Sequence, residues 1–172
     1  MRLDDINKLD RREFAAKLGG LFEGPPWIVT AAWERRPFTD EARLYETLCE
    51  IVDSAPRDSQ LALLRAHPDL AGKLALAGKL SLASTHEQAA AGLDSLTPAE
   101  LEEFTRLNAA YKSKFAFPFV MCARLSTKET IHAAFTERLT HSYDDEVHTA
   151  LIEVNKICAL RLHDLLTDGD QE

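Results

Sequence analysis

Helix-start signals recur along the whole chain and constrain its fold more than any other feature. Each is a Ser, Thr or Asp followed three residues later by an acid, the pattern in which the first side chain caps a helix and the second bonds back to it. The pairs are Asp10 with Glu13, Ser84 with Glu87, Thr97 with Glu100, Ser126 with Glu129, and Ser142 with Asp145. Pro98 strengthens the third signal, because proline at the first helical position loses no hydrogen bond. The signals predict a succession of helices.

Apolar residues between these signals recur at helical spacing. The stripes are Tyr45, Leu48 and Val52; Leu101, Phe104, Leu107, Tyr111 and Phe115; and Val147, Ala150, Leu151, Val154, Ile157, Cys158, Leu162 and Leu165. No two alternating runs joined by a turn signal indicate a hairpin. We therefore predict a single all-α, bundle-like domain over residues 1–172, with about seven to eight helices by the cap count. The last residues, "DGDQE", are expected to form a flexible acidic tail.

The segment "KFAFPFVMCARL" departs from this helical pattern. Phenylalanines alternate at 115, 117 and 119, and Pro118 stands between them, where a helix would be broken. We predict a buried extended crossing near 115–125. Its main-chain groups need hydrogen-bond partners, which a ligand could supply. A short apolar linker packed on the core explains the pattern equally well.

Charge and composition exclude several classes of protein. Lys and Arg total 20 against 28 Asp and Glu, which argues against binding a phosphate backbone. No apolar run approaches the roughly 20 residues of a membrane span, and the charged N-terminus lacks the apolar core of a signal peptide. The three cysteines have no metal-type spacing and are typical of reduced thiols. We expect a cytoplasmic protein that binds neither nucleic acid nor membranes.

One histidine occupies an unusual position at a helix end. Leu61 and Leu64 lie three apart, so the next inward-facing position is His67. Pro68 disfavours the helical conformation at His67, so the helix should stop there. A titratable ring is thus expected to face the core at a turn, where it is either a structural histidine or a catalyst.

Arg161 interrupts the apolar stripe of the last helix. A buried arginine is costly unless it pairs with a carboxylate or an anionic ligand. Alternatively, its stem packs on the core while the guanidinium reaches solvent. Both interpretations stay open from the spacing alone.

The stretch "STHEQ" is similarly ambiguous. Ser84 with Glu87, or Thr85 with Gln88 one position later, could simply cap a helix. The same polar groups at a helix N-terminus could instead orient a small polar molecule.

The remaining histidines form no pair at metal spacing with a nearby acid, so we predict no metal site. The sequence also contains no glycine-rich phosphate loop, no nucleophile elbow and no CxxC motif. Without a cofactor motif, any chemistry is expected to be acid–base and electrostatic.

Taken in order, several motifs resemble one enzyme family over nearly the whole chain. They are "FEGPPW" (22–27), "RRPF" (35–38), "LLRAHPDLAGK" (63–73), "SLASTHEQAAAGLDSL" (81–96), "LNAAYKSKFAFPFV" (107–120), "RL" (138–139) and "LRLHDLL" (160–166). This combination is similar to the 2-oxo-4-hydroxy-4-carboxy-5-ureidoimidazoline (OHCU) decarboxylases of urate breakdown. The resemblance implies an all-helical, usually dimeric, cofactor-free enzyme that converts OHCU into (S)-allantoin and carbon dioxide.

The resemblance also implies roles for individual residues. Its catalytic histidine and glutamate correspond to His67 and Glu87. The substrate-binding residues that it implies are Pro68, Ser84, Gln88, Phe119, Val120 and Arg161, with main-chain groups acting at the "FPFV" crossing.

The chain departs from the family pattern at three places. Gly24 replaces a common histidine, Ala116 stands in a usual "KFGFPF", and Leu125 replaces the glycine of a common "VRG". Two alternative functions remain: a cofactor-free lyase or isomerase acting on another ureide, and a helical ureide-binding or scaffold module without catalysis.

Overall fold

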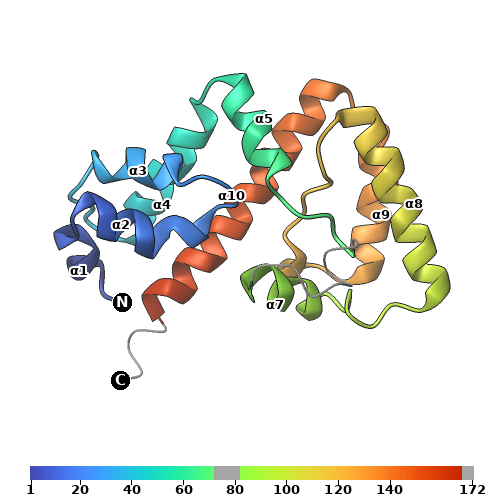
Figure 1. Cartoon of the computed structure of the whole chain (residues 1–172), viewed down its shortest axis with the longest axis horizontal. Coiled ribbons are helices and arrows are strands. Elements are labelled where there is room, and N and C mark those ends of the chain that lie inside the picture. The colour runs from blue at the N-terminus through green and yellow to red at the C-terminus, as the bar shows by residue number, and fades with distance from the viewer. Residues whose placement is uncertain (72–81, 168–172) are drawn as a thin grey trace. The chain divides into compact units, whose positions relative to one another are not determined.

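A computed structural model describes residues 1–71 and 82–167, and within these ranges the chain is all-helical without a strand (Figure 1). The α-helices described are α1 (Leu3–Lys8), α2 (Arg11–Leu18), α3 (Trp27–Trp33), α4 (Glu41–Asp53), α5 (Arg57–Arg65), α7 (Leu82–Ala90), α8 (Pro98–Phe115), α9 (Lys128–Arg138) and α10 (Tyr143–Thr167). Two 3₁₀-helices accompany them, η1 (Gly19–Leu21) and η2 (Ala123–Leu125). The all-α prediction is confirmed, while the predicted acidic tail lies outside the described residues.

Most of the helix starts follow from the capping side chains. The confirmed caps are Asp10 with Glu13, Thr97 with Glu100, and Ser142 with Asp145. The described helices slightly outnumber those predicted, and two of them, α1 and α3, begin without a capping side chain. The cap of α4, Asp40, was not among the predicted signals. Side-chain caps are common but dispensable where packing holds a helix.

The predicted start of α9 is wrong by one residue. Its N-cap is Thr127, which forms a reciprocal capping box with Thr130. Ser126 instead donates its hydroxyl to the carbonyl of Cys122 at 3.0 Å. Ser126 and Thr127 could each have capped the helix. Because the hydroxyl of Ser126 is bonded to Cys122, Thr127 is the residue that caps α9.

The chain forms two compact units, and α10 contributes to both. The first contains residues 1–63 and the chain from 155 onward. In this unit α2 packs on α3 and α3 on α4, and Figure 1 shows these helices in blue and cyan beside the red end of α10. The predicted stripe of α4 is largely confirmed, since Leu48 and Val52 are buried while Tyr45 is only partly so.

The second unit, residues 64–154, is built around aromatic rings. Tyr111 and Phe115 of α8 are fully buried, and Phe135 of α9 stacks on Phe119 with 3.7 Å between ring centroids. Residues 116–122 follow no regular structure, and Phe117 is buried among the same rings. The predicted crossing is confirmed for residues 116–122, whereas Phe115 still belongs to α8 and residues 123–125 form η2.

Within the described residues, no helix is both long and apolar enough to cross a membrane.

Candidate functional site

His67 lies just beyond the end of α5, as its proline neighbour predicts. The helix ends at Arg65, and the main-chain N–H of His67 still donates to the carbonyl of Leu64 at 3.2 Å. The residue is only 7% exposed. With Pro68 it borders an open cavity of about 440 Å³, whose other walls include Phe117 and Pro118 from the crossing. The structure thus brings the histidine turn and the crossing to one hollow.

The turn after His67 is held by Gln88 of α7. The Gln88 carbonyl oxygen accepts the N–H of Ala71 at 3.0 Å, and its amide nitrogen donates to the carbonyl of Asp69 at 3.4 Å. Ala71 has a positive φ of 51°, a conformation that non-glycine residues adopt only when their surroundings enforce it. Gln88 therefore shapes the turn, and one hydrogen of its amide group remains for another partner.

Ser84 lies inside α7, so the alternative that it caps this helix is wrong. Thr85 lies inside α7 as well, so it cannot start that helix either. Ser84 and Gln88 are four residues apart on one helical face, and both are buried. Glu87 is partly exposed beside them. α7 as a whole packs against η2, which directly follows the crossing.

The backbone of the crossing combines clamped and unpartnered groups. The carbonyl of Val120 accepts a hydrogen bond from Arg138 at 2.8 Å, and the N–H of Cys122 donates to Glu153 at 2.9 Å. By contrast, the N–H groups of Phe119 and Val120 have no hydrogen-bond partner among the described residues, although the two residues are 0% and 3% exposed. Buried main-chain donors without a partner in the protein are rare and are satisfied by a bound water molecule or a ligand.

A buried polar network behind the crossing was missed from the sequence. Glu146 accepts hydrogen bonds from the guanidinium of Arg138 at 2.6 Å and 2.9 Å and from the hydroxyl of Tyr111. His141 contacts its other oxygen at 2.9 Å. Burial, and then the bond to Glu146, raise the pKa of Tyr111 well above its ordinary value, so the phenol remains a donor. Of its members, Arg138 and Tyr111 belong to motifs that carry the family resemblance, but neither motif indicates a pairing with Glu146.

Arg161 lies in the first unit, where it is paired rather than extended into solvent. Its side chain is 9% exposed, and the guanidinium contacts Glu23 at 3.1 Å and the carbonyl of Gly20 at 3.1 Å. The solvent-reaching interpretation is therefore wrong. Glu23 was not predicted as its partner, although it belongs to the "FEGPPW" motif.

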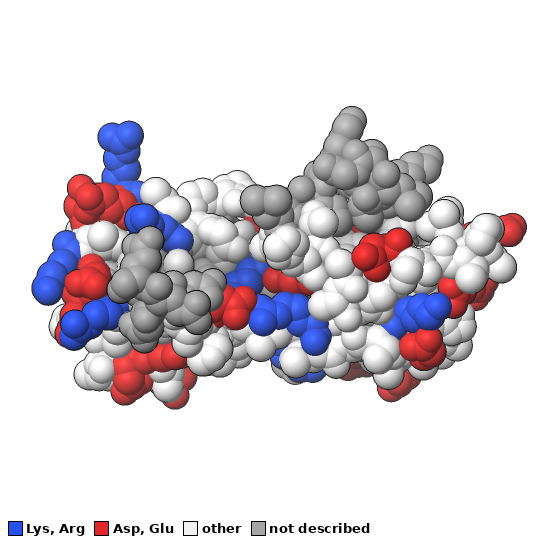
Figure 2. Space-filling view, turned by 90° about the horizontal axis from the view of Figure 1, so that it is seen from below, with Lys and Arg blue, Asp and Glu red and all other residues white. Residues whose placement is uncertain are grey.

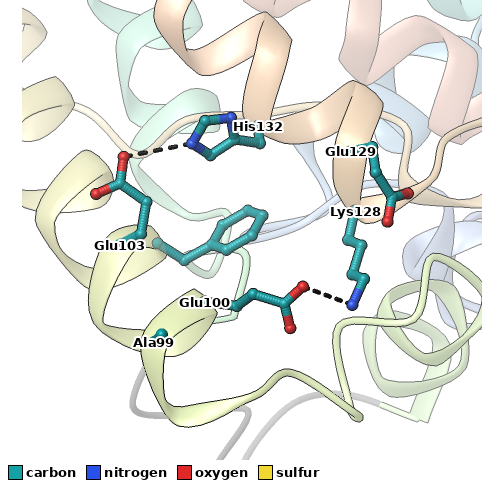
Figure 3. Close-up of a pocket in the computed structure, with 7 residues that line it drawn as sticks. Ala99, Glu100, Glu103, Lys128, Glu129 and His132 are labelled. Atoms are coloured by element: carbon teal, nitrogen blue, oxygen red, sulfur yellow. Dashed lines mark hydrogen bonds and ion pairs between the residues drawn. The ribbon is translucent and has the colours of Figure 1, made fainter.

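A second hollow, of about 420 Å³, lies between α8 and α9 and contains none of the predicted site residues (Figure 3). Lys128 contacts Glu100 at 2.6 Å across it, and His132 contacts Glu103 at 3.3 Å. Lys128 thus offsets the charge of Glu100, while Glu129 lines the same hollow.

Acidic and basic side chains are interspersed on the face shown in Figure 2, and no extended basic area appears among its described residues. The described part of the chain also contains no group of three His, Cys, Asp or Glu side chains that could hold a metal ion.

Comparison with known proteins identifies the family. A sequence model of the OHCU decarboxylases matches residues 7–163. A relative from Halalkalicoccus jeotgali, named 2-oxo-4-hydroxy-4-carboxy-5-ureidoimidazoline decarboxylase, is 40% identical over 174 residues, covering 100% of this chain and 97% of that protein. A Mus musculus protein of the same name is 40% identical over 166 residues, covering 96% of this chain and 93% of its own.

Solved structures agree with this assignment. The structure of an (S)-allantoin synthase superimposes with a TM-score of 0.78 at 30% identity, covering 96% of this chain and 54% of the other. An OHCU decarboxylase determined in the presence of (S)-allantoin shares the fold, with a TM-score of 0.68 at 24% identity over 83% of this chain and 92% of its own. From residue 7 to residue 163, this chain belongs to the OHCU decarboxylase family.

Proposed function

We propose that this protein is a cofactor-independent decarboxylase that converts OHCU into (S)-allantoin and carbon dioxide. The observation that carries the proposal is the 40% identity, over 100% of the chain, to a relative named for this activity. The two compact units then act as one catalytic domain, because the family match extends through both.

The substrate itself explains how the reaction can proceed without a cofactor. Breaking the bond to the carboxylate leaves an electron pair on the hydroxyl-bearing carbon. The adjacent C=N group accepts this pair and its nitrogen takes up a proton, so that an enol-like intermediate forms. Loss of the hydroxyl proton and protonation of the ureido-bearing carbon then give the ketone. The protein needs to place a base, a proton source and hydrogen-bond partners around the ring.

His67 is our proposed base. It hydrogen-bonds the 4-hydroxyl and takes its proton as the intermediate collapses. Glu87 holds a ring or ureido N–H and takes part in proton delivery. Delivery to one face alone yields the S product. The buried turn position of His67 supports this assignment, because a base shielded from water is also held in orientation.

The remaining predicted residues are proposed to bind the substrate. Ser84 and the free amide hydrogen of Gln88 contact the ureido group, Pro68 shapes the turn, and the unpartnered N–H groups of Phe119 and Val120 receive substrate oxygens. For Arg161 we propose contact with the substrate's ring oxygen. A tight grip on the departing carboxylate would stabilise the ground state and slow its loss.

We also propose that the protein is a homodimer and acts in the cytoplasm. The first proposal rests on the resemblance to the family, and the second rests on three cysteines that are typical of reduced thiols. Light scattering of the purified protein tests the first, since a dimer has twice the mass of the 19.2 kDa chain.

The deciding experiment supplies OHCU in situ from urate with uricase and hydroxyisourate hydrolase. Circular dichroism then follows the formation of optically active allantoin. We expect fast formation with the wild-type protein, and a loss of about 10²- to 10⁴-fold in kcat for His67→Ala, the range attributed to a general base.

The matched control is His86→Ala, which removes an exposed histidine of α7 and should leave kcat unchanged. Near-normal kcat in His67→Ala would refute the assigned base. If wild-type protein gives only the slow racemic product of the protein-free reaction, the decarboxylase proposal is wrong. The protein would then be better interpreted as a ureide-binding module without catalysis.

A further inference from the structure

Arg138 is a buried arginine of the second unit that contacts two residues of the crossing and has no role in the proposed reaction so far. The side chain is 6% exposed. Its guanidinium donates to the carbonyl of Val120 at 2.8 Å and lies over the ring of Phe119, 4.3 Å from the centroid. Both residues are proposed substrate contacts, and Arg138 lies behind them.

The guanidinium is itself fixed by Glu146, which is 0% exposed. Two of its nitrogens, Nε and Nη2, donate to the same carboxylate oxygen, while Nη1 reaches Val120. Tyr111 and His141 complete the contacts of Glu146. A planar guanidinium whose Nε and Nη2 are both bonded to Glu146 has little freedom to rotate. The position of Nη1, which bonds Val120, is therefore fixed as well.

This arrangement fixes the orientation of the peptide that joins Val120 to Met121. Because a trans peptide is planar, a carbonyl held on Arg138 directs the N–H of Met121 to the opposite side. Glu153 fixes the following peptide through the N–H of Cys122. The path of the preceding residues, whose N–H groups are unpartnered, is thereby limited.

We propose that Arg138 is a positioning residue of the decarboxylase, which holds the crossing so that the main-chain N–H groups of Phe119 and Val120 face the substrate. The proposal rests on the proposed function and goes beyond it, since Arg138 itself touches no substrate. A misplacement of about 1 Å in a binding group can lower catalysis about 10²-fold.

Arg138→Lys tests the proposal. Lysine keeps the positive charge beside Glu146, but a single ammonium on a shorter reach cannot bond that carboxylate and the Val120 carbonyl in the same way. We expect a folded protein in which kcat/KM falls about 10- to 100-fold, with KM raised. Hydrogen exchange of the amides at 119–122 should become faster. Arg106→Lys, an exposed arginine in the same unit, should change neither quantity.

Tyr111→Phe separates positioning from general destabilisation. It removes one donor from Glu146 and should lower stability, yet it leaves the bond from Arg138 to Val120 in place. We expect kcat and KM per folded molecule to stay within about twofold of wild type, in keeping with a change that leaves the transition-state contacts in place. If Arg138→Lys does not fold, Glu146→Gln tests the same role of Arg138. It removes the negative charge that holds the guanidinium but keeps an oxygen that accepts a hydrogen bond.

The outcomes are distinct. Wild-type kinetic constants per folded molecule in Arg138→Lys, or equal kinetic losses in Arg138→Lys and Tyr111→Phe, would overturn the positioning role. Failure of the decarboxylase proposal would appear as absent turnover in the wild type, whereas the exchange rates at 119–122 would still report whether Arg138 holds the crossing.

Discussion

Ala116 ends α8 in the left-handed region, with φ of 58° and ψ of 23°. This is the position at which the family pattern "KFGFPF" has glycine, the residue that adopts such angles without a Cβ clash. An L-residue pays roughly 1–2 kcal/mol here. The departure noted from the sequence is therefore a site of backbone strain directly before the crossing.

We predict that Ala116→Gly stabilises the protein. Relief of the strain exceeds the extra freedom that glycine gives the unfolded chain, about 0.4–1 kcal/mol, so the net gain in unfolding free energy is roughly 0.5–1 kcal/mol. Chemical denaturation measures it. Ala109→Gly, at an exposed position inside α8, is the control and should lose about 1 kcal/mol. A loss in both variants would contradict the strain at 116.

Single residues differ in how far the sequence could place them. His67 was located correctly because its neighbours act locally: a helical stripe and a proline decide where it lies. The partner of Arg161 was not found, since Glu23 is distant in sequence and no spacing rule connects the two. The same holds for Arg138 and Glu146, whose pairing depends on how α9 and α10 pack.

At the scale of elements, α8 and α9 are joined by ion pairs that depend on pH. The Lys128 ammonium lowers the pKa of Glu100 to about 2, and Arg106, with a smaller effect of His132, lowers the pKa of Glu103 to about 2. Both values are below those of the unfolded chain, about 4.3. The stability from these groups is thus present above about pH 4.3 and is lost as the pH falls toward 2.

We predict a corresponding difference in acid sensitivity. Between pH 5 and pH 2.5 the unfolding midpoint of wild type should fall further than that of Glu100→Gln/Glu103→Gln, in which the titrating groups are absent. Glutamine preserves the capping box of α8, so the comparison isolates the charges. Glu102→Gln, at a position without an ion pair among the described residues, should behave like wild type. Parallel midpoints in all three proteins would contradict the prediction.

Elements were predictable where their signals are local. Three capping signals gave correct helix starts, and Pro118 correctly indicated the crossing. The failures are of two kinds. α1 and α3 lack capping side chains, so no local signal marks where they begin. Ser126 and Ser84 do belong to capping patterns, but Ser126 donates to the carbonyl of Cys122 and Ser84 lies within α7.

At the scale of the whole molecule, product binding should stabilise the native chain. A ligand that binds only the folded state raises the unfolding free energy by about 2.7 kcal/mol at 100 times its Kd. We predict that millimolar (S)-allantoin raises the unfolding midpoint of wild type and that Arg161→Ala and Gln88→Ala abolish this shift. Arg106→Ala, which removes an exposed charge, should retain it. An unchanged shift in Arg161→Ala would remove this residue from the proposed site.

From the sequence, the arrangement of the whole chain could be predicted only as far as its fold class, all-α. Caps and stripes indicate helices, but they do not indicate that α10 contributes to two compact units or which helices pack in each. The candidate site depended on the family resemblance for the same reason: residues 67, 84–88 and 119–120 are separated by long stretches of chain. Their proximity in the second unit rests on contacts such as that of Gln88 with the turn at Asp69.

The unpartnered main-chain donors of the crossing affect how this protein can be studied and how it can diverge. A backbone N–H persists whichever side chain follows it, so positions 119 and 120 can exchange one apolar residue for another without losing a hydrogen bond to a ligand. Alanine scanning would overlook such a contact. Replacing one amide by an ester, through a hydroxy acid built into the chain at 119 or 120, would remove the donor while keeping the side chain. Under the proposed function, part of the specificity of this chain is carried by groups that a comparison of side chains does not reveal.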